Sequence, residues 1–198
     1  MRQFIVLAHE APTTPSFSLA DLAGGAGRLD LVCRCCNAAL FRSHGIRSAV
    51  RIDIVLADEL TIRFDGSELR GLHPDERSTA ARIRSTLEDR DRAIGAIPAT
   101  PSPGVSLFRR DTEATLRSAA ENGSIVELHE DGEPLASASL PDDPVFVLSD
   151  HLDFTDAEVD LLAELSSVRV SLSPERLHAD HSITVAHNYL DTDGFTRY

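Results

Sequence analysis

The chain has 198 residues, of which 42% are hydrophobic, so it is long enough for one domain with its own core. It has no apolar run near the roughly 18–20 residues that cross a bilayer and no charged leader before an apolar stretch, so a cytoplasmic protein without membrane contact is expected. The net charge of −13 has the wrong sign for the basic surface that normally binds nucleic acid.

The first half of the chain carries apolar patterns of both helix and strand period. In chain order they predict a strand at 4–8, a helix from about 28 to 44, a strand at 51–57, a hairpin of 61–64 and 67–70, and a helix from 73 to about 94. Gly45 marks the end of the first helix, because glycine is common just after helix C-termini. Asp65-Gly66 marks the hairpin turn, since this dipeptide suits a primed turn.

The second half continues the alternation. It predicts a loop at 100–104, a helix at 112–120, a strand at 124–128, a tight polar turn at 129–134, a strand at 145–148, a short helix after residue 155, a strand at 168–172 and a helix from about residue 180. Pro101 and Pro103 indicate the loop, and Thr155 is the expected N-cap of the short helix. Strands that alternate with helices predict an α/β fold with a mostly parallel sheet, in a single domain over residues 1–198.

Small polar residues follow two of the predicted strands. Residues 149–151 read Ser-Asp-His after the strand at 145–148, and residues 173–175 read Ser-Pro-Glu after the strand at 168–172. Ligands of open α/β sheets bind beyond the carboxyl ends of strands, so a ligand crevice is expected here. Residues 24–27 (Gly-Gly-Ala-Gly) precede a helix but follow no strand directly, so they lack the context of a Rossmann phosphate loop.

Two groups of potential metal ligands lack a usual zinc spacing: Cys33, Cys35 and Cys36 in the first helix, and His178, Asp180 and His181 near the last. No metal is therefore predicted. The thiols are expected to be free and buried or half-buried in a reducing cytosol. Asp180 is expected to cap the last helix.

All 19 basic residues are arginine, and no lysine occurs. One interpretation of the acidic composition is that the protein has nothing to do with RNA. The other is a high-salt cytoplasm, in which an acidic, lysine-poor surface stays hydrated and charge repulsion is strongly screened. The absence of lysine favours the second interpretation.

Asp30 and Arg34 lie at positions i and i+4 of the first helix and can form an ion pair, whereas Arg28 and Asp30 are not expected to share a face. The pair is open to two interpretations. It is either a solvated surface ion pair of little energetic value, or part of an arginine pair that holds an RNA phosphate or a turned-out base while Asp30 orients Arg34.

An ordered set of short segments resembles a known family. The segments are residues 2–9 (Arg-Gln-Phe-Ile-Val-Leu-Ala-His), 27–34, 45–47, 64–67, 128–132 and the tract 145–190. Over nearly the whole chain they resemble the archaeal tRNA pseudouridine-N1-methyltransferases (TrmY-type) of the SPOUT class. The resemblance implies a SPOUT (alpha/beta knot) fold with a deep trefoil knot in about residues 124–198, and a homodimer in which each site borrows groups from the partner.

The resemblance also implies S-adenosylmethionine as cofactor, bent and held by backbone groups of three loops. The implied cofactor-binding residues are Leu128, Leu148, Ser149, Leu172, Ser173, Pro174, Glu175, Arg176, Leu177 and Ser182. Many relatives carry Gly at the position of Ser149 and Cys at that of Ser182. Both replacements are small, so backbone contacts are expected to survive them. Whether Ser182 bonds the cofactor through its side chain stays open.

The implied reaction is methylation of N1 of the pseudouridine at position 54 in the T-arm of tRNA, a base that has to be turned out of its stack. Asp150 is the first candidate for the base that takes the N1 proton, with His9 and His151 as alternatives.

Arg28 and Arg34, with Asp30 beside them, are candidates to stabilise charge on the uracil carbonyls. Related rRNA pseudouridine-N1-methyltransferases have a similar Arg-x-Asp at this place. Two rival functions are therefore such an rRNA enzyme, and a non-catalytic RNA-binding protein that keeps the knot.

Overall fold

The structure, a computed structural model, describes residues 1–43 and 45–198. Its helices are α1 (Leu29–Leu40), α2 (Glu76–Glu88), α3 (Thr112–Ala120), α4 (Asp156–Leu165) and α5 (Ala179–Asp191), with a 3-10 turn, η1 (Arg90–Arg92). Its strands are β1 (Arg2–Ala8), β2 (Phe41–Arg42), β3 (Gly45–Ile46), β4 (Val50–Leu56), β5 (Leu60–Asp65), β6 (Ala99–Ser102), β7 (Val105–Phe108), β8 (Ser124–Pro134), β9 (Pro144–Ser149) and β10 (Ser166–Ser171). No helix in the described residues is long and apolar enough to cross a membrane.

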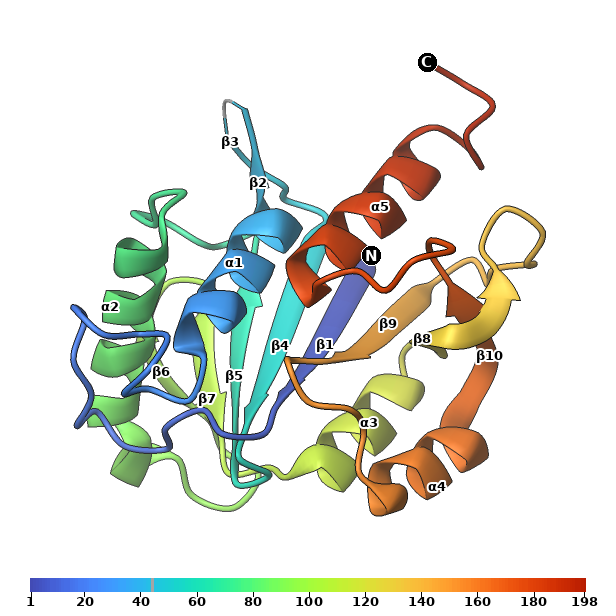
Figure 1. Cartoon of the computed structure of the whole chain (residues 1–198). Helices are drawn as coiled ribbons and strands as arrows, with labels where there is room; N and C mark the ends of the chain where they lie inside the picture. The colour runs from blue at the N-terminus through green and yellow to red at the C-terminus, as the bar shows by residue number, and fades with distance from the viewer. Residues whose placement is uncertain (44) are drawn as a thin grey trace.

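Eight strands form one sheet in the order β10-β8-β9-β1-β4-β5-β7-β6 (Figure 1). The strands from β10 to β4 in this order run parallel, and β5, β7 and β6 add antiparallel at the other edge. This arrangement confirms the predicted α/β fold with a mostly parallel sheet.

Alternate residues of β1 point to opposite faces of the sheet, as the strand period of two requires. Phe4 and Val6 join the larger apolar cluster, which includes buried residues of α1, α2 and α5. Ile5 and Leu7 join the smaller cluster, which includes buried residues of α3 and α4. In Figure 1, α1 and α5 lie side by side over the central strands, and these helices begin near the carboxyl end of β9.

Several elements agree with the sequence prediction. α3 covers the predicted range, and α4 begins directly after Thr155. Thr155 caps α4 in a capping box with Glu158, so two backbone donors at the helix start are satisfied. The three cysteines of α1 are free and buried, as predicted.

The first predicted helix is too long. α1 ends at Leu40, and Phe41 has extended backbone because β2 pairs antiparallel with β3. Gly45 therefore lies in β3 and does not end the helix. His44, the other residue of that predicted helix end, lies outside the described residues.

The predicted hairpin is misplaced. β4 and β5 pair antiparallel around Ala57 and Asp58, whose φ angles are 46° and 55°. β5 is bounded by β4 on one side and β7 on the other, so it has no free edge for a strand at 67–70. Gly66 is required for space instead, because a Cβ there would lie 2.1 Å from the carbonyl oxygen of Arg47.

Two further predictions are wrong at the antiparallel edge. α2 ends at Glu88 rather than near Ile94, and η1 follows it. The predicted loop at 100–104 overlaps β6, which includes Pro101. β6 pairs with β7, a strand absent from the sequence prediction. β6 is the edge strand, where a proline is tolerated because one side of the strand makes no ladder bonds.

The predicted polar turn at 129–134 belongs to β8, and this correction shapes the site. The ladder between β8 and β10 shifts register between Arg169 and Val170, which leaves residues 128–132 outside it. These residues form an excursion of β8 between two neighbouring rungs. At its end, a Cβ on Gly132 would lie 2.4 Å from the backbone carbon of Val170, so only glycine fits where β8 and β10 approach this closely.

Candidate active site

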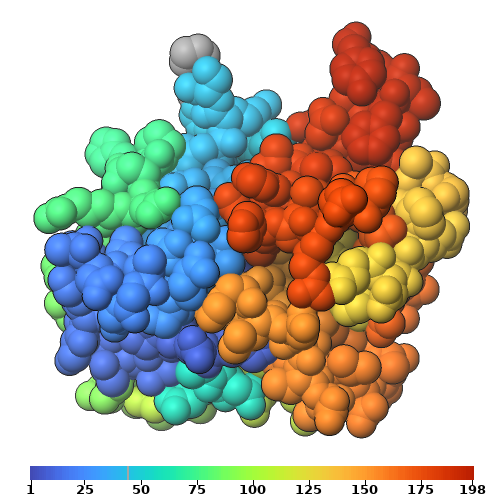
Figure 2. Space-filling view, in the orientation of Figure 1, coloured from blue at the N-terminus to red at the C-terminus, as the bar shows by residue number. Residues whose placement is uncertain are grey.

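A cavity of about 450 Å³ opens at the carboxyl edge of the parallel strands. Its walls are the excursion of β8, the loop between β9 and α4, the loop between β10 and α5, the first turn of α5, and Arg28 at the start of α1. Figure 2 shows the three loops, yellow, orange and red-orange, meeting on one face of the molecule. The crevice expected at the strand ends is therefore present.

Nine of the ten predicted cofactor-binding residues line this cavity, and Pro174 does not. The lining residues among them are Leu128, Leu148, Ser149, Leu172, Ser173, Glu175, Arg176, Leu177 and Ser182. The cavity therefore brings together residues that are up to 54 positions apart, from 128 to 182.

The structure adds lining residues that the sequence did not predict as cofactor-binding: His129, Glu130, Leu152, Asp153, Phe154, Val170, His178 and Ala179. The excursion of β8 carries His129 and Glu130 to the cavity, where the ring of His129 stacks on Phe154 at 6.4 Å between centroids. In the sequence, only their position next to the predicted loops points to these two residues, because an excursion from a strand leaves no periodic pattern.

Arg176 connects the three loops around the cavity. Its guanidinium donates to both carboxylate oxygens of Glu130 on the β8 excursion, and to Asp153 in the β9–α4 loop at 3.2 Å. The three side chains are exposed, so each ion pair contributes little to stability. Their arrangement nevertheless places one cation and two anions on adjacent walls of the cavity.

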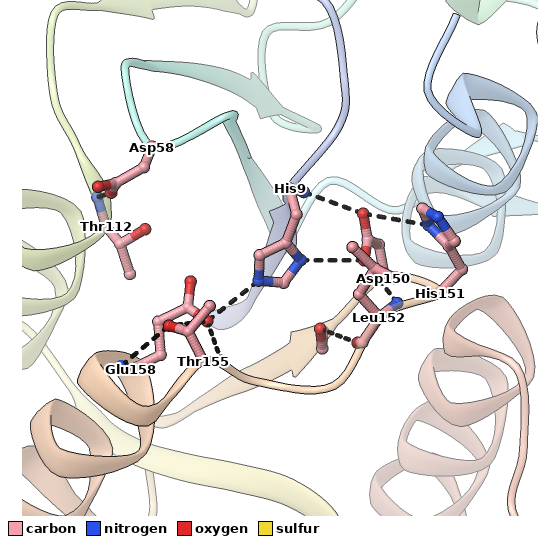
Figure 3. A network of polar contacts seen from close by, with 9 residues as sticks. His9, Asp58, Thr112, Asp150, His151, Leu152, Thr155 and Glu158 are labelled. Atoms are coloured by element: carbon pink, nitrogen blue, oxygen red, sulfur yellow. Dashed lines mark hydrogen bonds and ion pairs between the residues drawn. The ribbon is translucent and has the colours of Figure 1, made fainter.

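The carboxylate of Asp150 lines the cavity and is almost fully buried, with 1% of its side chain exposed. It lies within a network of hydrogen bonds and ion pairs (Figure 3). Its Oδ1 accepts hydrogen bonds from Nδ1 of His9 at 3.0 Å and from the backbone N–H of Leu152 at 2.9 Å. Its Oδ2 accepts one from the backbone N–H of His9 at 2.9 Å and lies 3.4 Å from Nδ1 of His151. Asp150 thus ties the end of β1 to the loop after β9.

His9 extends this network to α4, since its Nε2 lies 3.0 Å from Oε2 of Glu158. Hydrogen bonds to Asp150 and then Glu158 raise the pKa of His9 to about 10, against the opposing effect of burial. The imidazole is therefore protonated at neutral pH and donates from both ring nitrogens. Burial raises the pKa of Asp150, but hydrogen bonds from His9 and Leu152 outweigh it and hold that pKa below its usual value.

Asp30 accepts hydrogen bonds from both predicted arginines. Arg28 donates from Nε to Oδ1 at 3.0 Å and from Nη2 to Oδ2 at 3.2 Å, and Arg34 donates from Nη1 to Oδ2 at 2.9 Å. The predicted Asp30–Arg34 pair is confirmed. The expectation that Arg28 and Asp30 cannot meet is wrong, because Arg28 precedes α1 with a left-handed φ of 58° and is not bound by helix geometry.

These charges differ in their access to the cavity. Arg28 lines it, whereas Asp30 and Arg34 do not. Burial raises the pKa of Asp30, but the hydrogen bonds from Arg28 and Arg34 lower it to about 2. Asp180 is not the cap of α5 as predicted, since His178 is the N-cap; it lies in the first turn, 3.5 Å from Nε of Arg34.

Comparison with known proteins identifies the family. A family model described as "Putative SAM-dependent RNA methyltransferase" matches residues 1–195. The chain belongs to this family. It is 64% identical over 198 residues, all of both chains, to the tRNA (pseudouridine(54)-N(1))-methyltransferase of Haloferax volcanii, and 62% identical over 198 residues to that of Haloarcula marismortui, again with full coverage of both. The Methanocella arvoryzae protein of the same name is 44% identical over 93% of this chain and 96% of its own.

A solved structure also resembles this chain in fold. Archaeoglobus fulgidus Nep1 bound to S-adenosylhomocysteine superposes with a TM-score of 0.64 at 14% sequence identity, covering 94% of this chain and 95% of that one. At this identity the likeness concerns the fold alone. This chain and Nep1 therefore share a fold.

Within residues 1–43 and 45–198, no group of three or more His, Cys, Asp and Glu side chains is arranged to hold a metal ion. The absence of a metal from the reaction stays a prediction.

Proposed function

We infer that the chain transfers the methyl group of S-adenosylmethionine to N1 of the pseudouridine at position 54 of tRNA. This proposal rests on sequence identity: the chain is 64% and 62% identical, over its full length, to two relatives that are named for this activity. The acidic, lysine-free composition of this chain fits the high-salt interpretation, so the charge of −13 does not argue against an RNA substrate.

The cavity fits the proposed cofactor. Its volume of about 450 Å³ lies within the roughly 300–1,000 Å³ of small-molecule sites. Leu128 and Leu172 offer an apolar surface for an adenine ring, Glu130 offers a carboxylate for the cationic groups, and Arg176 offers a guanidinium for the carboxylate. When bound, S-adenosylmethionine supplies a methyl group activated by the sulfonium, so the chain mainly holds and orients the reactants.

The proposed cofactor contacts are Leu128, Leu148, Ser149, Leu172, Ser173, Glu175, Arg176, Leu177 and Ser182, which all line the cavity. Pro174 lies outside that lining and stays a prediction. The Ser149 hydroxyl donates to the carbonyl of Leu152, which keeps the turn after β9 tight. A small side chain at this position lets the backbone approach a ligand closely.

Arg28 is the arginine best placed to meet the target base. It lines the cavity, and Asp30 holds its guanidinium through two parallel hydrogen bonds. A planar, charged donor fixed in this way suits the negative charge that develops on the uracil carbonyls when N1 loses its proton. Asp30 and Arg34 complete the proposed catalytic set: Asp30 holds both arginines, and Arg34 contacts RNA beyond the cavity.

We also propose that residues 1–198 form one SPOUT domain, that about residues 124–198 carry the trefoil knot, and that the protein works as a homodimer in the cytoplasm, where tRNA is modified. The fold shared with Nep1 supports the SPOUT domain. The knot rests on the family resemblance, since connections in other folds normally avoid threading.

A methylation assay with radiolabelled S-adenosylmethionine at molar potassium chloride tests the function. Three RNAs are compared: a tRNA with pseudouridine at position 54, the same tRNA with uridine there, and an rRNA fragment with pseudouridine. Label in the first RNA alone is expected. Label in the rRNA fragment alone would identify an rRNA enzyme instead. No label in any RNA, together with no heat on calorimetric titration of S-adenosylhomocysteine, would indicate a non-catalytic RNA-binding protein.

A further inference from the structure

We propose that His151 accepts the proton from N1 of the target base, and that Asp150 acts as a positioning residue that orients the His151 ring. This inference rests on the proposed function and names the acceptor that the reaction requires. It follows from the hydrogen bonds that already occupy Asp150 and from the place of His151 in the cavity wall.

Both oxygens of Asp150 are already engaged, so this carboxylate is poorly placed to accept a substrate N–H. Each carboxylate oxygen has two favourable lone-pair directions. Oδ1 takes two donors, from the ring of His9 and the backbone of Leu152, and Oδ2 takes the backbone N–H of His9 and faces Nδ1 of His151. Only 1% of the side chain is exposed, so a base in the cavity would have to displace one of these partners.

His151 is built as a base with an orienting carboxylate. Its ring lines the cavity with 20% of the side chain exposed, and its Nδ1 lies 3.4 Å from Asp150. A carboxylate beside Nδ1 favours the tautomer with the proton on that nitrogen, which leaves the Nε2 lone pair free to act. Nε2 lies 3.3 Å from Glu10, whose side chain is 59% exposed and therefore free to give way to a substrate.

His9 holds the carboxylate of Asp150 in place and does not itself line the cavity. It presents a protonated imidazole to Asp150 on one side and to Glu158 on the other, so Asp150 stays ionised and its plane is fixed. The charged groups that face His151 are Asp150 from its own loop, Glu10 from the loop after β1, and Arg28 across the same cavity.

In the proposed methyl transfer, the N1–H bond breaks and the proton goes to Nε2 of His151. The N1 electron pair forms the new bond to the methyl carbon. The electron pair of the carbon–sulfur bond leaves with sulfur, which becomes a neutral thioether. The imidazolium then loses its proton to solvent at the open side of the cavity, so His151 returns to its starting state.

Two readouts on the full-length protein test the assignment. The first is the pH dependence of kcat for His151→Gln beside wild type, with cofactor affinity from calorimetry. A fall in kcat of about 100-fold is expected, as for loss of a general base, with cofactor affinity changed less than about threefold. The residual rate should keep rising with pH, because N1 then ionises without help. His73→Gln, an exposed histidine on the way into α2, is the matched control.

The second readout needs no turnover: the tautomer of the His151 ring, read from its nitrogen chemical shifts by NMR, in wild type and in Asp150→Asn. Replacing the carboxylate by a neutral amide should reduce the population of the tautomer protonated at Nδ1, while circular dichroism reports a folded chain. The kcat of Asp150→Asn should fall while its cofactor affinity changes little. A merely structural Asp150 would alter stability without changing the tautomer.

The outcomes separate the two proposals. If wild type methylates pseudouridine in tRNA but His151→Gln keeps both its rate and its pH profile, the base assignment is overturned and the function stands. An unchanged His151 tautomer in folded Asp150→Asn overturns the positioning role. If wild type transfers no methyl group to any RNA, the proposed function fails and the assignment of His151 falls with it.

Discussion

Nδ1 of His9 and Oδ1 of Asp150 lie 3.0 Å apart, across 141 residues of sequence, and the same imidazole reaches Glu158 with its other nitrogen. Three elements, β1, the loop after β9 and the start of α4, therefore meet at one protonated ring. The contact lies directly behind the proposed active site, so it links the stability of the sheet edge to the geometry of the cavity.

This contact predicts alkaline sensitivity. The pKa of His9 in the folded chain is about 10, above the ordinary value of about 6.5 for a free imidazole. The stability that the imidazolium contributes is therefore complete below pH ~6.5 and is lost as pH rises from there towards 10. The unfolding midpoint of wild type in denaturant should fall across this window.

His9→Phe removes the positive charge from between two carboxylates. A loss of about 3 kcal/mol is expected at neutral pH, as for a buried ion pair that loses one partner, and the fall in stability between pH ~6.5 and 10 should be smaller than in wild type. Equal slopes in the two proteins would show that another group controls the alkaline limb.

Arg28→Ala should reduce turnover much more than cofactor affinity, because the guanidinium faces the target base in the proposed site. The expected loss in kcat is on the order of 100-fold if it stabilises developing charge. Asp30→Asn should be milder, since this carboxylate acts by holding Arg28 and Arg34. Arg92→Ala, at a side chain that is 73% exposed, is the control. A matching loss of cofactor affinity in Arg28→Ala would place it in the cofactor site instead.

Ser149→Leu should weaken cofactor binding, because a bulky side chain at the end of β9 intrudes on the cavity. A cost of about 1–3 kcal/mol, or roughly 5- to 150-fold in affinity, is typical of overpacking. Ser149→Ala is the control: it loses only the bond to the Leu152 carbonyl. Calorimetry with S-adenosylhomocysteine measures both. Unchanged affinity in a folded Ser149→Leu would remove this loop from the site.

Gly132→Ala should destabilise the fold, because the new methyl group would lie 2.4 Å from the backbone carbon of Val170. Backbone in a neighbouring paired strand cannot move aside cheaply, so a loss of about 3 kcal/mol is expected. Gly45→Ala is the matched control, because a Cβ there has no neighbour within 4 Å. Chemical denaturation of both variants gives the comparison. Similar stabilities would mean that β8 and β10 tolerate a methyl group at this contact.

Salt should stabilise the protein. Among 198 residues, 32 are acidic and none is lysine, so lowering salt exposes repulsion between carboxylates that ions otherwise screen. The thermal unfolding midpoint should fall steadily from molar potassium chloride to roughly physiological salt. A midpoint that is flat or rises over this range would falsify the high-salt interpretation.

The sequence by itself determined the elements whose signals are local. Thr155 predicts the start of α4 because an N-cap acts within one helix turn, and the apolar run of β1 predicts a central strand because both faces of that strand are buried. The cofactor loops were predicted from a resemblance spread over the chain, and nearly all of their residues do line one cavity.

The tertiary structure alone decided the features that depend on distant partners. β8 continues past Leu128 because it pairs with β10 some 40 residues later, and no local signal marks that pairing. Arg28 meets Asp30 because left-handed backbone places it outside the helix, which helix spacing does not predict. Asp150 reads as a free carboxylate in the sequence, but its oxygens are occupied once β1 lies beside β9, since that contact brings His9 to it.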